Sequence, residues 1–168
     1  ATSFLSAGTV TFPCTLISAL YYPSGAGVAT MWMGRDTSHA GAWRFQDYTP
    51  ASSNYTCYLI GKGSGPTWAD GAQINVWEFD PAGTSYFYKE LARTTVVGTL
   101  TTLYNPFNYQ FSLGGSATGT YDIKTDTEIG EFIVLNEILS DTTMDGSNVS
   151  GGQLHTIITY LKSKYGIS

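Results

Sequence analysis

The sequence predicts an all-β domain with a single helix at its carboxyl end. Strand signals recur roughly every 10–14 residues between turns rich in Gly and Pro, which is typical of β-sandwiches and barrels. Charged residues make up only 12% of the chain, about half the roughly 25% of an average domain. The polarity of this protein therefore comes from hydroxyl, amide and backbone groups rather than from ions.

The expected strands are runs of β-branched and aromatic residues bounded by turn residues. They cover residues 9–12, 14–22, 28–33, 42–47, 55–60, 74–79, 85–89, 94–103, 109–113 and 129–135. Residues 61–71 are expected to form a loop, because this segment contains Pro66 and several glycines.

A helix is predicted at about 153–165, within one domain that spans residues 1–168. Its apolar residues recur at helical spacing on one face: Leu154, Ile157, Ile158, Leu161 and Tyr165. Lys162 and Lys164 complement the helix dipole in the last turn, and Gly166 suits a left-handed cap. Ser150 is the expected N-cap. This helix should pack across the sheet or cover one of its edges.

The charge distribution narrows the class of partner. The net charge is −5, and the eight basic residues are scattered along the chain. Nucleic acid and anionic membranes are therefore not expected partners, because both need clustered Lys and Arg. The uncharged segment before Arg35 reads as strands and turns rather than as a membrane span or signal peptide. An uncharged glycan or another protein fits better.

Cys14 and Cys57 are the two cysteines. Their spacing fits no zinc motif. They either form a disulfide, worth about 4 kcal/mol in the chain-entropy model, or remain reduced thiols on strands. The sequence leaves both alternatives open.

The last 40 residues or so contain a recognisable pattern: Ile129 to Asn136 (IGEFIVLN), Ile138 to Asp141 (ILSD) and Tyr160 to Ile167 (YLKSKYGI). This pattern resembles the carboxyl end of concanavalin A-like, or laminin G-like, jelly-roll domains of microbial and phage surface proteins. The resemblance implies a two-sheet antiparallel sandwich with one carboxyl-terminal helix. Residues 142–152 depart from the family pattern, in which the segment ending at Asp141 leads directly into the helix.

Catalytic groups are sparse. Glu78 and Asp80 have the spacing of two that places carboxylates on one strand face, as a glycosidase needs. The alternative is that Asp80 is a turn residue. Glu128 and Glu131 are three apart, so on a regular strand they should face opposite sides and form no pair.

No cofactor or metal site is predicted. His155 is expected on the solvated side of the helix, and His39 in a loop with Asp36 and Ser38, where no nucleophile motif surrounds them. A surface calcium held by Asp36, Asp47 or Asp70 is an open alternative.

Sugar binding on this fold uses aromatic rings with nearby polar groups. The candidate contacts to a glycan or protein partner are Trp43, Tyr48, Trp68 and Asp70, which lie in or beside expected loops. Trp43 alternates with Phe45, a pattern that is more typical of a core position than of a ligand contact. Trp32 and Trp77 are expected in the core.

The favoured function at this stage is a non-enzymatic virion protein: a capsid decoration, knob or tail-fibre module. Such a protein would act through capsid, tail or identical subunits, as a homo-oligomer or part of a larger assembly. This expectation rests on the low charge, the many aromatics and the phage-like carboxyl end. A secreted or cell-surface carbohydrate-binding module, lectin-like or receptor-binding, is the first alternative. A glycoside hydrolase or lyase is the second.

Overall fold

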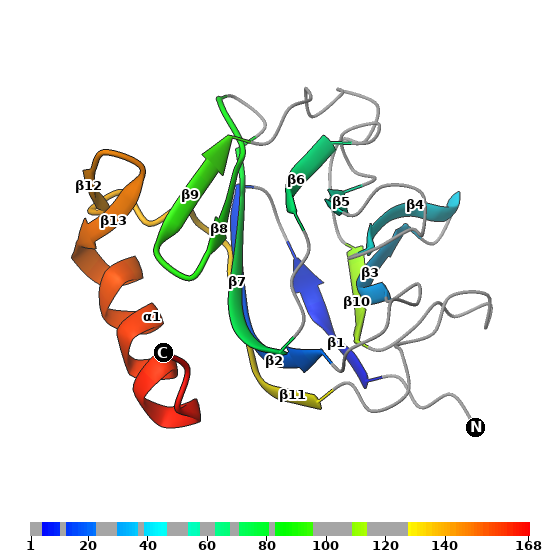
Figure 1. Cartoon of the computed structure of the whole chain (residues 1–168). Coiled ribbons are helices and arrows are strands. Elements are labelled where there is room, and N and C mark those ends of the chain that lie inside the picture. The colour runs from blue at the N-terminus through cyan, green and yellow to red at the C-terminus, as the bar shows by residue number, and fades with distance from the viewer. Residues whose placement is uncertain are drawn as a thin grey trace.

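The computed structural model describes main chain and side chains for residues 13–22, 71–80, 83–95 and 128–168. It describes the main chain alone for strands at 5–10, 30–36, 39–46, 54–57, 63–67 and 109–113. Over these residues the chain forms antiparallel strands and one carboxyl-terminal helix (Figure 1), which confirms the all-β prediction. No helix among these residues has the length and apolar character that a membrane span requires.

The strands form two sheets. The six-stranded sheet has the order β1 (Leu5–Val10), β10 (Tyr109–Leu113), β3 (Thr30–Asp36), β4 (His39–Gln46), β5 (Asn54–Cys57) and β6 (Gly63–Thr67). The seven-stranded sheet has the order β11 (Glu128–Leu135), β2 (Cys14–Tyr22), β7 (Gly71–Phe79), β8 (Tyr86–Lys89), β9 (Ala92–Thr95), β13 (Asn148–Gly151) and β12 (Thr143–Asp145). Figure 1 shows the seven-stranded sheet between the helix α1 (Gly152–Tyr165) and the six-stranded sheet.

Both faces of the seven-stranded sheet are buried at its centre. On the helix side, an apolar cluster joins the sheet to α1 through Ile17, Ala19, Ile74, Val76, Leu154, Ile158 and Leu161. On the opposite side, the Trp77 ring lies 4.5 Å from that of Phe87 and 5.9 Å from that of Phe79, between centroids. Burial on both faces explains why β2 reads as a nearly continuous apolar run rather than an alternating one.

The segment that departs from the family pattern forms a hairpin of β12 and β13. The hairpin leaves Asp141 beside the start of α1, where its Oδ2 accepts a 3.0 Å hydrogen bond from the Gln153 backbone N–H. Gly152 has a φ of +87°, and a Cβ there would collide with the Asp141 carbonyl. Asp141 therefore satisfies one of the free N–H groups at the helix start across the insertion.

Several expected boundaries are corrected. The N-cap is Gly151, not Ser150, because α1 begins at Gly152, directly after the last residue of β13. The expected loop at 61–71 contains β6 and the first residue of β7. His39 begins β4 opposite Asp36 of β3 rather than lying in a loop. In each case strand pairing overrides the local preference of Gly, Pro and Ser for turns.

Candidate functional site

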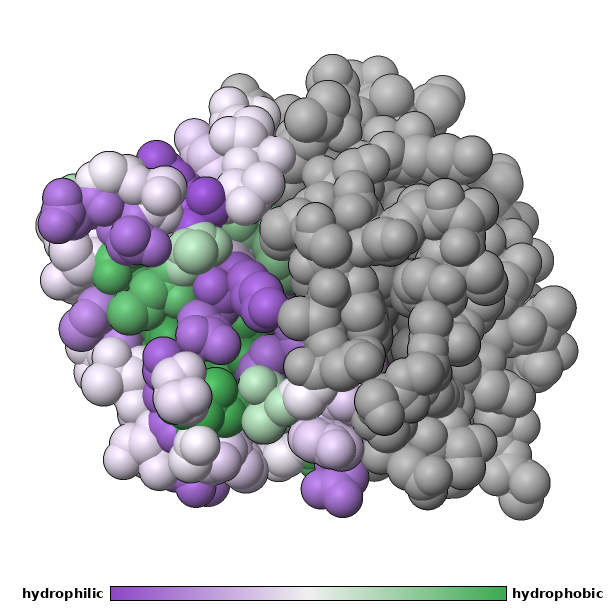
Figure 2. Space-filling view, viewed as in Figure 1, coloured by the Kyte–Doolittle hydropathy of each residue, from purple (hydrophilic) through white to green (hydrophobic). Residues whose placement is uncertain are grey.

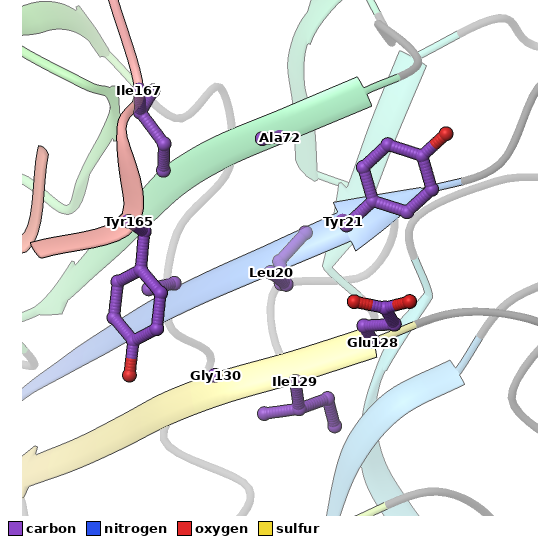
Figure 3. A pocket seen from close by; sticks show the side chains of 9 residues that line it. Leu20, Tyr21, Ala72, Glu128, Ile129, Gly130, Tyr165 and Ile167 are labelled. Carbon is purple, nitrogen blue, oxygen red and sulfur yellow. The ribbon is translucent and has the colours of Figure 1, made fainter.

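A hollow of about 320 Å³ opens on the helix side of the seven-stranded sheet, just beyond the end of α1 (Figure 3). We call it the Tyr21–Tyr165 hollow. Its lining comes from β2, β7, β11 and the chain after α1: Ala19, Leu20, Tyr21, Ala72, Glu128, Ile129, Gly130, Tyr165 and Ile167. This volume is at the lower end of the roughly 300–1,000 Å³ typical of small-ligand sites.

The hollow exists because the sheet extends further than the helix that covers it. Past the last turn of α1, the residues on the helix side of the sheet are small: Ala19 on β2, Ala72 on β7 and Gly130 on β11. Figure 3 shows the Tyr21 and Tyr165 rings at the two ends of this floor. Tyr21 is 43% exposed, one of two large exposed hydrophobic side chains in the described part of the chain.

Glu128 lies directly opposite Tyr21 in the antiparallel pairing of β11 with β2. Directly opposite residues share a face, with Cβ atoms about 4.5–5.5 Å apart. On the other side of Tyr21, its partner in β7 is Ala72. The exposed ring thus has a carboxylate on one side and a methyl group on the other.

The expected opposite orientation of Glu128 and Glu131 is wrong. Glu128 pairs with Tyr21 and Glu131 with Ala19, which are two residues apart and share a face of β2. The register shifts between Ile129 and Glu131, so Gly130 is an extra residue in β11. Such a β-bulge restores to one face two residues that a regular strand would separate.

Glu131 anchors the wall of the hollow rather than its opening. Its Oε2 accepts hydrogen bonds from Lys164 Nζ at 2.9 Å and from the Tyr165 hydroxyl at 3.3 Å. The bond from Lys164 lowers the pKa of Glu131 and raises that of Lys164. These contacts hold the Tyr165 ring against Gly130.

The hollow is chemically suited to a hydroxyl-rich ligand. Tyrosine rings offer apolar faces and hydroxyl tips, and a carboxylate makes strong charge-assisted hydrogen bonds with hydroxyl donors. A sugar ring has C–H groups on its faces and hydroxyl groups around its edge. Tyr21, Glu128 and Tyr165 together match that pattern.

The glycosidase hypothesis for Glu78 finds no support in its surroundings. Glu78 is only 3% exposed, and the Tyr88 hydroxyl donates a 2.5 Å hydrogen bond to its Oε2. Burial raises the pKa of Glu78, and burial together with Glu78 raises the pKa of Tyr88. Asp80 is a turn residue, as the alternative predicted, since its carbonyl accepts the Gly83 N–H at 3.4 Å.

Cys14 is fully buried in β2 with a free thiol. Burial raises the pKa of this thiol to about 12. The structure thus favours the reduced alternative for Cys14. The side chain of Cys57 lies outside the described residues.

The site residues predicted from the sequence lie where the structure does not describe side chains. Tyr48, Trp68 and Asp70 belong to segments that the structure does not describe, and for Trp43 only the main chain in β4 is described. Asp47 is likewise outside. The described residues hold no group of three or more His, Cys, Asp or Glu side chains that could bind a metal.

No protein-family model and no curated protein matches this sequence. Among solved structures, the Trypanosoma rangeli sialidase is similar over 92% of this chain, with a TM-score of 0.56 and 10% identity. The same enzyme with 2,3-difluorosialic acid as a covalent intermediate gives 0.57. This chain spans only 23% of the length of that enzyme. At such identity the likeness shows the fold alone.

The expectation of a virion structural protein is wrong. The three similar solved structures compared above are all of a sialidase, and none of them is a capsid or tail protein. Tyr21 and Tyr160 are the only large exposed hydrophobic side chains of the described part. Figure 2 shows purple and pale residues around smaller green patches on this side of it.

Sequence reasoning missed Tyr21, Glu128 and Tyr165 as site residues. The sequence pattern places Tyr21 in a strand, Tyr165 on the apolar helix face and Glu128 outside any carboxylate pair. The sequence contains one signal. Successive side chains of a strand point to opposite faces, so Tyr21 lies on the face of β2 opposite to that of Leu20 and Tyr22. Where α1 ends over that face could not be read from the sequence.

Proposed function

We propose that this chain is a carbohydrate-binding module of jelly-roll type, and that it binds a glycan in the Tyr21–Tyr165 hollow. The observation that carries the proposal is the exposed Tyr21 ring directly opposite Glu128, above a floor of Ala19, Ala72 and Gly130. The similarity to the fold of a sialidase supports a glycan as the general class of ligand, without indicating which sugar.

The proposal is limited to binding. Most glycosidases place two carboxyl groups on either side of the bond that they cleave, although sialidases use a tyrosine nucleophile instead. Among the described residues that line the hollow, Glu128 is the only carboxylate. The carboxylate of the nearby Glu131 already accepts hydrogen bonds from Lys164 and Tyr165.

The test is a glycan array followed by calorimetric titration with the full chain and three variants. Tyr21→Ala should weaken binding at least tenfold, about 1.4 kcal/mol, as expected when an aromatic anchor is truncated. Tyr160→Ala is the matched control, since Tyr160 is 56% exposed on α1 and lines no part of the hollow. The Tyr160→Ala variant should bind the glycan with the same affinity as the parent chain.

Trp68→Ala separates this site from the loop aromatics that the sequence predicted. Loss of binding in Trp68→Ala with no effect of Tyr21→Ala would keep the glycan-binding function and overturn the site. Absence of binding to every glycan on the array would overturn the function.

A further inference from the structure

The charge around the hollow sets the class of sugar that it can accept, if the proposed glycan-binding function is correct. We infer that the Tyr21–Tyr165 hollow selects uncharged glycan ends and rejects carboxylated sugars, with Glu128 as the residue that determines this selection. The inference deepens the proposed function and depends on it.

The first argument is the state of Glu128 itself. Its side chain is exposed, it lines the hollow, and it forms no salt bridge or hydrogen bond within the described part of the chain. An anionic ligand beside Tyr21 would therefore face an uncompensated negative charge. Repulsion between like charges a few ångströms apart is only partly screened at a partly enclosed site.

The second argument is that the two lysines in the last turn of α1, within the described part of the chain, are already paired. Lys164 donates to Glu131 at 2.9 Å, and Lys162 donates to Glu90 at 3.3 Å. Neither lysine lines the hollow. Recognition of a carboxylate usually needs Arg, Lys or free N–H groups, and the described residues of the lining supply no cationic side chain.

The third argument is that the hydroxyl groups of a neutral sugar can form hydrogen bonds with the lining of the hollow. A neutral sugar can donate its hydroxyl protons to the Glu128 carboxylate, while its C–H faces lie against Tyr21 and the Ala72 methyl. The volume of about 320 Å³ suits the end of a glycan rather than a long polysaccharide segment.

The experiment compares matched glycans that differ by one group, such as glucose-terminated and glucuronic acid-terminated chains, immobilised on the same array. The parent chain should bind the neutral member at least tenfold more tightly than the carboxylated one. In Glu128→Gln this ratio should fall several-fold, because the amide removes the negative charge and keeps a hydrogen-bonding oxygen. Raising the salt concentration should narrow the ratio for the parent chain but not for the variant.

Glu137→Gln is the charge-matched control, since Glu137 is exposed beyond the other end of β11 and does not line the hollow. It should leave the ratio unchanged. Equal or tighter binding of carboxylated glycans by the parent chain, or an unchanged ratio in Glu128→Gln, would overturn the inference and leave the glycan-binding function standing. No binding of either member by any chain would overturn both.

Discussion

The Tyr165 ring packs against Gly130 so closely that a Cβ on Gly130 would lie 2.6 Å from Tyr165 Cε1 and 2.7 Å from Cζ. This contact joins the end of α1 to the bulge in β11. It fixes one wall of the hollow, and it depends on the absence of a side chain at position 130.

Gly130→Ala should displace the half-buried Tyr165 ring. The ring can move toward solvent, so the fold should lose about 1 kcal/mol, the lower end of the cost of overpacking. Glycan affinity should fall with it. Denaturant unfolding of a double-mutant cycle checks the cause, since the same substitution should have little effect when Tyr165 is already Ala. An equal loss of stability in both backgrounds would refute the contact as its source.

The packing of α1 against the sheet should contribute most of the stability of this end of the molecule. Ile158 is fully buried in the apolar cluster with Ile17 and Val76, so Ile158→Ala should cost about 2–5 kcal/mol in thermal or urea unfolding. The exposed Ser163→Ala on the same helix should stay within about 0.5 kcal/mol of the parent. Similar effects for the two variants would mean that α1 does not pack as described.

Glu78 should make stability depend on pH. Burial raises its pKa in the folded state above the ordinary value of 4.5, so the folded chain binds more protons than the unfolded chain above that pH. The contribution of Glu78 to stability is therefore fully present below its unfolded pKa and is lost as pH rises through its folded pKa. Glu78→Gln should flatten this slope in urea unfolding measured from pH 4 to 8. A parent chain whose stability gains from ionisation of Glu78 in this window would contradict the account.

Cys14 should be inert in the folded protein. Its thiol is buried and its pKa is raised to about 12, so almost no reactive thiolate exists at pH 8. In a Cys57→Ser variant, a thiol reagent should label Cys14 only after denaturant is added. A parent chain that shows no free thiol when denatured without reductant would establish the Cys14–Cys57 disulfide instead.

The strand pattern and the helix were predictable because they follow local periodicity. The residues 14–22 and 109–113 match β2 and β10 as expected, and the helix at about 153–165 differs from α1 by one residue. The hollow was not predictable, because it depends on where α1 ends over β2 and on the bulge at Gly130 that turns Glu128 toward Tyr21. The spacing of apolar residues does not predict how far a sheet extends beyond the helix that covers it. It also does not predict a bulge in one strand.

The most direct test of the central claim is an NMR titration of tyrosine-labelled protein with the neutral glycan that binds most tightly on the array. The ring signals of Tyr21 and Tyr165 should shift together and saturate at the affinity measured by calorimetry, while that of Tyr160 should stay in place. If other tyrosine signals shift to saturation while those of Tyr21 and Tyr165 stay in place, the glycan binds elsewhere and the account is contradicted.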